Sequence, residues 1–228
     1  MSKRRGHPPQ FFLSLYGWTF WVPILVLGIL AIAFCLIMPG MWRVAILFGL
    51  LTFACLAFYR DFPRPIPQQA HVMVAPADGK VSEISQVDYY APFSGPALKV
   101  GIFLSVLDVH VNRSPCDGIV LWTRYEEGLF LDARHPDCSG KNQSNTICLA
   151  NPNTPTEASC VIKQIVGAIA RRIIAPVTPG ETFTRGQRIG MIAFGSRTEL
   201  YVPAKENWKC AVVLGAHVKG GKDVLLQK

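Results

Sequence analysis

The first 58 residues of the 228-residue chain contain no aspartate or glutamate, and between Phe11 and Phe58 the only charged residue is Arg43. In that stretch 38 of 48 residues are apolar, which excludes a simple soluble globule. The formal net charge is +8, but after position 58 only 19 basic residues face 15 acidic ones. Because the excess charge is not gathered into one folded basic patch, no nucleic-acid partner is expected.

The chain also lacks a Cys-x-x-Cys pair among its seven cysteines. An odd number of cysteines without paired spacing argues against a disulfide framework and favours a reducing compartment. The run His135-Pro-Asp-Cys138 joins two residue types that bind metals, but it stands alone in a polar segment. We therefore expect no metal site.

One apolar run is long enough to cross a membrane. Phe20 to Met38 gives 19 residues, Pro39-Gly40 interrupts the run, and Val44 to Phe58 adds 15 more. As a helix the second run measures about 22 Å, short of a hydrocarbon core of about 30 Å. Two arrangements stay open: a two-helix hairpin, or one span followed by a re-entrant helix. A late start and the lack of a small-x-small cleavage site argue against a cleaved signal peptide.

Basic residues flank both outer ends of this apolar region, Lys3-Arg4-Arg5 before it and Arg60 and Arg64 after it. The positive-inside tendency then places both ends in the cytoplasm. Prolines at 63, 65 and 67 form a stiff, non-helical connector. We predict a membrane anchor of one or two apolar helices over residues 1–62. A separate domain over 63–228 would lie on the cytoplasmic side of the cell (inner) membrane.

After residue 60 there is no long apolar stripe of helical period. Short β-like runs bounded by turn residues recur about every ten residues, which predicts a mainly β, barrel-sandwich-like domain. Ala75–Val81 resembles Ser114–Val120, since each is a Pro-x-Asp-Gly turn that opens into a strand. Thr178–Ile192 is similar to the turn-and-strand pattern of biotinyl and lipoyl carrier domains. Together these repeats predict pseudo-symmetric halves.

The expected strands cover most of this domain, but two segments are not assigned to them. Asp132–Ser159 is rich in Asn, Ser, Thr and Pro and is expected to be a long functional or mobile loop. Ile165–Ile174 fits a helix or a strand equally well. The expected strands are His71–Val74, Lys80–Ile84, Leu98–Leu104, Ile119–Tyr125, Cys160–Val166, Arg188–Ala193, Thr198–Val202 and Ala211–Leu214.

The pair Gly195-Ser196 stands between two of these strands, in the run Phe194-Gly-Ser-Arg197. A Gly-Ser pair is often an ordinary turn. A glycine before a serine, however, permits backbone geometry that is closed to other residues. In such a strained turn the hydroxyl can attack the preceding carbonyl and convert an amide into an ester.

Other polar residues are candidates for chemistry. In a strand, Asp108, His110, Asn112 and Ser114 fall in one row, and such a row favours function over a purely structural histidine. Asp78 occupies a Pro-x-Asp-Gly turn, where ordinary turn chemistry is the alternative. The pair Arg171-Arg172 suits either a phosphate contact or a solvated surface.

Five segments in order resemble one known family, the short, membrane-anchored form of phosphatidylserine decarboxylase proenzymes. Each segment alone is weakly specific, but their order after an N-terminal apolar hairpin is specific, and the resemblance covers about residues 15–228. The segments are Phe58-Tyr-Arg-Asp-Phe-Pro-Arg64, Ala75-Pro-Ala-Asp-Gly79, Asp108-Val-His-Val-Asn-Arg-Ser-Pro115, Gln164-Ile-Val-Gly-Ala-Ile-Ala-Arg-Arg-Ile173 and Gly190-Met-Ile-Ala-Phe-Gly-Ser-Arg197.

The resemblance implies that the chain cuts itself between Gly195 and Ser196. The two products, 1–195 and 196–228, would form a heterodimer, and Ser196 would become a covalent pyruvoyl group. That group would bind phosphatidylserine from the lipid bilayer as a Schiff base. The reaction would release CO₂ and phosphatidylethanolamine. His110 would transfer a proton, and Asp78 would orient a catalytic group during self-cleavage.

One position departs from the family pattern. Longer forms carry a second histidine three residues after the first, where this chain has Arg113. Either His110 serves both self-cleavage and decarboxylation, or Asn112 and Arg113 stabilise the oxyanion and contact the substrate. The residue that activates Ser196, the acyl-chain preference and any higher oligomer stay open.

Two other readings of the sequence lead to different functions. A membrane-tethered serine hydrolase could use Ser196, His110 and Asp78 on an external substrate, but no Gly-x-Ser-x-Gly elbow is present. A non-enzymatic barrel-sandwich carrier or adaptor would need a modifiable lysine, typically in Met-Lys-Met or Asp-Lys-Ala. Neither tripeptide occurs.

Overall fold

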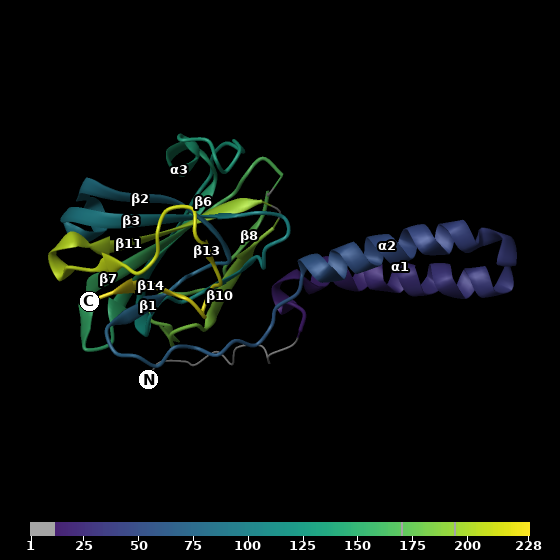
Figure 1. Cartoon of the computed structure of the whole chain (residues 1–228), viewed down its shortest axis with the longest axis horizontal. Coiled ribbons are helices and arrows are strands. Elements are labelled where there is room, and N and C mark those ends of the chain that lie inside the picture. The colour runs from purple at the N-terminus through teal and green to yellow at the C-terminus, as the bar shows by residue number, and fades with distance from the viewer. Residues whose placement is uncertain (1–11, 170, 194) are drawn as a thin grey trace. The chain divides into compact units, whose positions relative to one another are not determined.

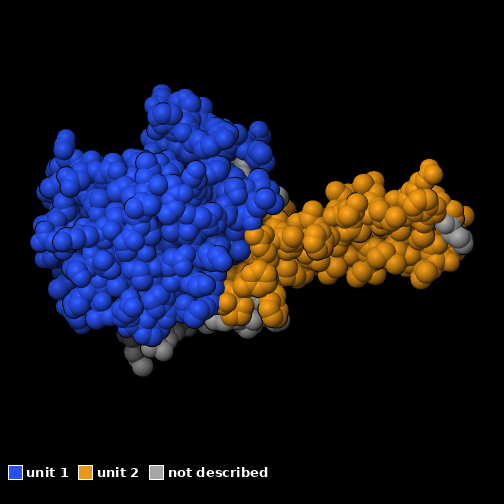
Figure 2. Space-filling model, in the orientation of Figure 1, with its two compact units in different colours: residues 1–7, 64–228 blue, residues 8–63 orange. Residues whose placement is uncertain are grey.

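The computed structural model describes residues 12–169, 171–193 and 195–228. This part of the chain divides into two compact units: the first along the chain lies within Pro8–Pro63 (orange in Figure 2), and the second covers Arg64–Lys228 (blue in Figure 2). Strand takes 40% of the structure and helix 24%, so the predicted mainly β class is confirmed. The orientation prediction rests partly on Lys3, Arg4 and Arg5, which lie outside the described residues, as does Phe194.

The first unit is a pair of apolar helices that run back along one another (Figure 1). A 3₁₀ turn η1 (Leu15–Gly17) leads into α1 (Trp18–Ile37), and η2 (Pro39–Met41) connects α1 to α2 (Trp42–Phe58). Leu15–Ile37 is long and apolar enough to cross a membrane, whereas α2 has 17 residues. The two helices therefore form a hairpin, and a full span by α2 stays a prediction.

Small residues let the two helices approach closely. A Cβ on Gly28 would lie 2.3 Å from the Thr52 Oγ1, and that hydroxyl donates a hydrogen bond to the Ile24 carbonyl at 3.3 Å. Leucines on the outside remain uncovered, with Leu36 81% exposed. An exterior of apolar side chains is suited to hydrocarbon, because a helix satisfies most of its backbone polar groups internally.

The second unit consists of short strands joined by turns, with three short helices between them. The helices are η3 (Ala91–Phe93), α3 (Cys138–Lys141) and η4 (Ala204–Glu206). The strands of its described residues are β1 (Val72–Val74), β2 (Gly79–Tyr90), β3 (Gly95–Leu104), β4 (Val111–Arg113), β5 (Gly118–Glu126), β6 (Ser144–Asn151), β7 (Thr154–Ile165), β8 (Ile173–Ile174), β9 (Thr182–Phe183), β10 (Arg188–Ile192), β11 (Ser196–Pro203), β12 (Lys209–Cys210), β13 (His217–Val218) and β14 (Val224–Gln227).

These strands form three sheets whose order repeats. The large sheet has the order β13-β2-β3-β11-β7-β6-β5-β9, and the two small sheets have the orders β1-β14-β12 and β4-β10-β8. The strands fall into two sets of seven that correspond one to one. When each strand is exchanged for its counterpart, the strand order of the large sheet is the same read backwards. The first set is β1, β2, β3, β11, β12, β13 and β14, and their counterparts, in the same order, are β4, β5, β6, β7, β8, β9 and β10. The same exchange converts one small sheet into the other. The predicted pseudo-symmetric halves are therefore present.

One half is inserted into the other. The inserted half, β4–β10, is continuous in sequence, whereas the divided half consists of β1–β3 and β11–β14. The chain crosses between the halves twice: residues 105–110 join β3 to β4, and residues 193–195 join β10 to β11. The candidate residues His110 and Gly195-Ser196 therefore lie at these two crossings.

The two Pro-x-Asp-Gly turns contact each other across the pseudo-symmetry. Val74 N donates to the Pro115 carbonyl at 2.9 Å, and Arg113 N donates to the Pro76 carbonyl at 2.8 Å. Gly79, with φ +145°, ends the first turn, and a Cβ there would lie 2.1 Å from the Phe103 carbonyl oxygen. The glycine is thus required by backbone conformation and by close strand approach.

Three of the sequence expectations are wrong. Asp132–Ser159 is not a long loop, because it contains α3, β6 and the start of β7. β6 is buried on both faces apart from its last residue, so it shows no alternation of apolar and polar side chains. Ala211–Leu214 is a turn region with Val213 73% exposed. Ile165–Ile174 is mostly loop, since β7 ends at Ile165 and only the last two residues form β8.

Candidate active site

Ser196 is the first residue of β11 and begins a strand in the middle of the large sheet. It pairs with Leu104 at the end of β3, and its side chain is fully buried. Among the described residues its Oγ has no hydrogen-bond partner. A buried hydroxyl without a partner is uncommon, because removing it from water costs free energy that a hydrogen bond normally offsets. Such a hydroxyl is available to react with a neighbouring atom.

Gly195 precedes this serine with φ +65°, in the left-handed region that favours glycine. Its carbonyl lies against Gly167, the second residue after β7. A Cβ on Gly167 would be 2.2 Å from the Gly195 oxygen and 3.2 Å from its carbonyl carbon. The space around this carbonyl is therefore fixed by the absence of a side chain at Gly167. Gly167 belongs to one of the five family segments, but the sequence alone assigns it no role.

His110 is joined to the same turn by its imidazole ring. Its Nε2 lies 3.1 Å from the Gly195 N, and its Nδ1 lies 2.9 Å from the Asp108 carbonyl oxygen. Since a backbone N–H can only donate, Nε2 is the acceptor and Nδ1 carries the proton that is donated to Asp108. These contacts define a neutral imidazole whose tautomer is set on both sides. His110 is fully buried.

The Asp108 carboxylate fixes the segment that holds His110. Its Oδ2 accepts hydrogen bonds from Ser105 N at 2.8 Å and Ser105 Oγ at 2.7 Å, and its Oδ1 lies 2.8 Å from His217 Nε2. Burial alone would raise the pKa of Asp108. The hydrogen bonds from Ser105 and His217 outweigh burial and lower the pKa. Ser105 and His217 were not singled out from the sequence, where 109 positions separate His217 from its partner.

Asp78 is engaged elsewhere. Its carboxylate accepts two hydrogen bonds from the Arg64 guanidinium, at 2.5 and 2.7 Å, and one from Gly220 N at 2.8 Å. Arg64 also donates to the Gly220 carbonyl at 2.7 Å. The partners of Asp78 are thus Arg64 and Gly220, and neither Ser196 nor His110 is among them. Its predicted orienting role in self-cleavage stays a prediction.

Asn112 belongs to a buried chain of amide side chains. Its Nδ2 donates to Thr198 Oγ1 at 2.9 Å, and its Oδ1 accepts from Gln164 Nε2 at 2.8 Å. Gln164 accepts in turn from Asn145 Nδ2 at 3.0 Å. Thr198 shares a face of β11 with Ser196, because alternate residues of a strand point the same way. The structure therefore brings Asn112 onto the serine side of the sheet.

Arg113, at the position of the second family histidine, is also buried. Its Nη1 donates to the Gly186 carbonyl at 3.0 Å, and its Cδ would be 2.7 Å from a Cβ on Gly221. The guanidinium thus contacts the turn before β10. Substrate contact by Asn112 or Arg113 stays a prediction.

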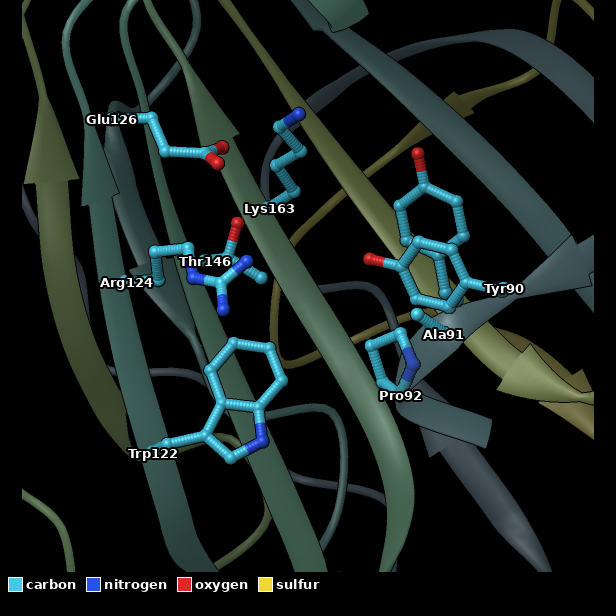
Figure 3. A pocket seen from close by; sticks show the side chains of 9 residues that line it. Tyr90, Ala91, Pro92, Trp122, Arg124, Glu126, Thr146 and Lys163 are labelled. Atoms are coloured by element: carbon cyan, nitrogen blue, oxygen red, sulfur yellow. The ribbon is translucent and has the colours of Figure 1, made fainter. Parts of the chain in front are cut away.

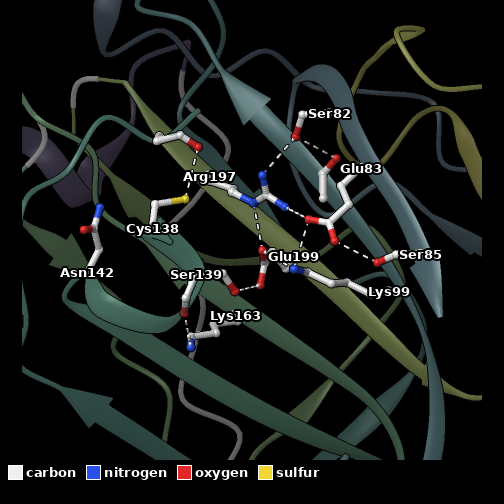
Figure 4. A network of polar contacts seen from close by, with 12 residues as sticks. Ser82, Glu83, Ser85, Lys99, Cys138, Ser139, Asn142, Lys163, Arg197 and Glu199 are labelled. Carbon is white, nitrogen blue, oxygen red and sulfur yellow. Dashed lines mark hydrogen bonds and ion pairs between the residues drawn. The ribbon is translucent and has the colours of Figure 1, made fainter. Parts of the chain in front are cut away.

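An ionic network lies on the opposite face of β11 (Figure 4). The Arg197 Nε donates to Glu199 at 2.7 Å, and Lys99 Nζ lies 3.1 Å from Glu199 and 3.0 Å from Glu83. Arg197 also forms an ion pair with Glu83. Burial would raise the pKa of Glu199, but the charges of Lys99 and Arg197 outweigh it and lower the pKa. The residue directly after Ser196 is therefore held in place.

A pocket lies on this same opposite face (Figure 3). Its lining includes Tyr90, Trp122, Arg124, Lys163 and Tyr201. The Tyr90 and Tyr201 rings stack with centroids 4.3 Å apart. Because Tyr201 alternates with Ser196 and Thr198 along β11, this pocket is separated from the serine by the sheet itself.

Comparison with known proteins gives consistent matches over most of the chain. Residues 51–226 match the family model described as phosphatidylserine decarboxylase. A phosphatidylserine decarboxylase proenzyme of Carboxydothermus hydrogenoformans is 39% identical over 213 residues, which cover 93% of this chain and 96% of the relative. A protein of the same name from Nitrosomonas europaea is 37% identical over 220 residues, covering 96% of each. One from Ralstonia nicotianae is 41% identical over 157 residues, covering 68% of this chain and 71% of the relative.

Proposed function

Because the chain belongs to the phosphatidylserine decarboxylase family, we propose that it converts phosphatidylserine into phosphatidylethanolamine and CO₂ after cutting itself between Gly195 and Ser196. The observation that carries this proposal is the buried Ser196 hydroxyl, which lacks a hydrogen-bond partner among the described residues and follows a glycine with φ +65°. A hydroxyl without a hydrogen-bond partner, directly after a glycine whose left-handed backbone few other residues adopt, is suited to attack on the peptide bond between the two residues.

The self-cleavage uses atoms of this chain alone, with water. The Ser196 Oγ attacks the Gly195 carbonyl carbon, the bond from that carbon to Ser196 N breaks, and the hydroxyl proton ends on the released amine. The resulting ester loses the Ser196 α-proton, and Gly195 departs as a carboxylate. Water then replaces the nitrogen of the remaining fragment and releases ammonia. These steps leave a ketone next to the former Ser196 carbonyl, which is a pyruvoyl group.

The surroundings of Ser196 fit such a group. Ser196 is fully buried, and none of the described residues forms a hydrogen bond with its hydroxyl, so converting the serine into a ketone would break no such contact. When formed, the group supplies a carbonyl that condenses with the substrate amine and takes up the electron pair released with CO₂. His110, with its ring at the Gly195 amide, is the residue that we assign to proton transfer.

The two products would remain together as a heterodimer. The short chain, 196–228, contains β11, which pairs with β3 on one side and β7 on the other, both in the long chain. It also contains β14, which pairs with β1. Cutting one crossing between the halves therefore leaves every strand pair of the short chain in place.

The apolar hairpin supports a location at a membrane. We assign the chain to the cell (inner) membrane with residues 64–228 on the cytoplasmic side, because the flanking basic residues follow the positive-inside tendency. In that position the enzyme would meet its lipid substrate in the same bilayer. A serine hydrolase acting on an outside substrate fits less well. The Ser196 hydroxyl is fully buried, and His110 Nε2 accepts from Gly195 N rather than from that hydroxyl.

Electrophoresis and intact mass test the proposal together. Wild-type protein should give two chains, with the shorter one beginning at position 196 and carrying a pyruvoyl terminus in place of serine. Ser196→Ala should give one uncut chain without decarboxylase activity. A single uncut wild-type chain that still forms phosphatidylethanolamine at full rate would overturn the self-cleavage mechanism.

A further inference from the structure

We propose that five exposed apolar side chains around the Gly195-Ser196 turn form a rim that docks on a phospholipid bilayer. The proposal rests on the proposed function, because the bilayer is where the lipid substrate would be. The rim is defined by residues on three separate loops of the second unit, and Leu107 and Ile169 are the most exposed of them, at 83% and 68%. The five residues are Val106, Leu107, Leu129, Phe130 and Ile169.

The first loop of the rim begins beside the serine. Leu104, the last residue of β3, is the pairing partner of Ser196, and Val106 and Leu107 follow it directly. A tight turn, closed by a 2.9 Å hydrogen bond from Asp108 N to the Ser105 carbonyl, presents these two side chains. Since the Asp108 carboxylate is held by Ser105, the exposed pair sits on a fixed turn.

The second loop lies against the carbonyl of Gly195. Gly167 is packed on that carbonyl, Ile169 follows two residues later, and Ala193 N donates to the Arg172 carbonyl at 3.1 Å. The loop from β7 to β8 is thus attached on both sides to the segment that precedes Ser196.

The third loop is linked to the second by a cation–π contact. The Arg171 guanidinium carbon lies 5.4 Å from the centre of the Phe130 ring, and Leu129 precedes that ring. The same loop reaches the catalytic turn through Ala133, whose Cβ would be 3.2 Å from a Cβ on Gly167. All three loops are therefore connected to one turn.

The chemistry of this rim fits a bilayer that contains anionic lipid. A single exposed leucine is common on the surface of a soluble protein, but a group of large exposed apolar side chains on neighbouring loops is not. Such a group marks an interaction surface. Arg171 and Arg172 are exposed beside this group, and basic residues next to an apolar surface favour acidic headgroups. A lipid whose headgroup must reach buried Ser196 can then keep its acyl chains within the hydrocarbon.

Photo-crosslinking in vesicles tests the rim directly. The full chain is reconstituted in phosphatidylcholine vesicles that contain phosphatidylserine, with a benzophenone amino acid at position 107 or 169. We expect lipid adducts at both positions. A benzophenone at Tyr89, which is 66% exposed, should give no lipid adduct. Lys80, near the start of β2, pairs with Phe103, the neighbour of the residue that pairs with Ser196, whereas Tyr89 lies at the other end of the same strand. Adducts to a second protein copy, or no lipid adduct at 107 and 169, would overturn the proposal.

The crosslinking result does not depend on catalysis, because it can be repeated with the uncut Ser196→Ala chain. A failed decarboxylase assay would therefore count against the proposed function, and missing lipid adducts would count against the rim alone.

Kinetics provide the second test. With long-chain phosphatidylserine in vesicles, the double variant Leu107→Glu/Ile169→Glu should be at least tenfold slower than wild type. With monomeric dihexanoyl phosphatidylserine in solution it should differ by less than twofold, and Tyr89→Glu should match wild type on both substrates. Equal losses on both substrates would mean that the substitutions damage the catalytic centre, and would overturn the bilayer role.

Discussion

At the scale of single residues, the candidate active site depends on glycines, which have no side chain, and on side chains whose hydrogen bonds are already formed with other residues. Ser196 and Gly195 could be named from the sequence, because a Gly-Ser pair between strands is a local signal. Gly167 could not, since its importance comes from a carbonyl that lies 28 positions later in the chain. The sequence assigned Asp78 an orienting role in self-cleavage, which stays a prediction, and it could not show that Arg64 and Gly220 donate hydrogen bonds to this carboxylate.

Gly167→Ala should slow self-cleavage and leave a large fraction of the chain uncut. The added Cβ would meet the Gly195 oxygen at 2.2 Å and force that carbonyl out of its present position. Densitometry of the two products over time measures the effect. Gly140→Ala is the matched control, because a Cβ there meets nothing within 4 Å among the described residues. Normal processing of Gly167→Ala would show that the position of this carbonyl is unimportant.

His217→Ala should reduce decarboxylation by at most about fivefold with little change in folding, because it removes from the carboxylate that fixes the His110 segment one hydrogen bond, worth at most about 1 kcal/mol since the His217 side chain is 57% exposed. Ser105→Ala removes another contact of the same carboxylate and should act in the same direction.

The pH dependence follows from the lowered pKa of Asp108. A carboxylate with a lowered pKa stabilises the fold above its unfolded pKa near 4, and this contribution disappears as pH falls through the folded value. The Asp108 carboxylate of the wild type should therefore stay ionised throughout pH 5–8, and its contribution to turnover should be present over that whole range. If His217→Ala and wild type have equal kcat values across that range, His217 does not position the site.

At the scale of secondary-structure elements, the strand at the centre of the large sheet has two different faces. Ser196 and Thr198 face the amide chain, and Arg197 and Glu199 face the ionic network. All eight residues of β11 are buried, so the strand has no exposed polar face that alternation could reveal. β6 was missed inside a segment rich in Asn, Ser and Thr, whereas β11 was predicted as Thr198–Val202 and half-exposed β5 as Ile119–Tyr125, each within two residues of its observed ends.

Glu199→Gln should destabilise the domain by about 2–3 kcal/mol, because it removes the fully buried one of the two carboxylates that Arg197 and Lys99 share and leaves them with half-exposed Glu83. Glu206→Gln, which alters a half-exposed pair with Lys228, should cost at most about 1 kcal/mol. Thermal melting in the uncut Ser196→Ala background measures both.

The pKa of Glu199 is lowered, so its stabilising contribution is present above the unfolded pKa near 4.3 and is lost as pH falls through the folded value. Wild type should therefore lose more stability than Glu199→Gln between pH 6 and pH 3. Parallel melting curves for the two proteins over that range would be inconsistent with an ionised Glu199.

At the scale of the whole molecule, the insertion of one half into the other explains where the chain can be cut. Turn motifs repeated near residues 75 and 114 made the two halves predictable. Their nesting was not, because the β12–β14 strands that complete the divided half are only two to four residues long. Only the pairing of the strands shows that residues 105–110 and residues 193–195 both connect one half to the other.

The cut chains should stay associated under native conditions and separate only in denaturant. β11 is paired on both sides by strands of the long chain and is fully buried, so its release would require unfolding of the large sheet. Size exclusion in mild detergent followed by intact mass of each peak measures this. A short chain that elutes alone without denaturant would contradict the strand pairing.

The contact between His110 and Gly195 also sets an order of events. In the newly folded chain the basic nitrogen of His110 already holds the Gly195 N–H, at 3.1 Å. Under the proposed self-cleavage, this nitrogen would be released for work on a substrate once residue 195 had become a chain end that can move away. Maturation would then precede turnover in every copy, and the chain's own fold would set the delay between synthesis and activity.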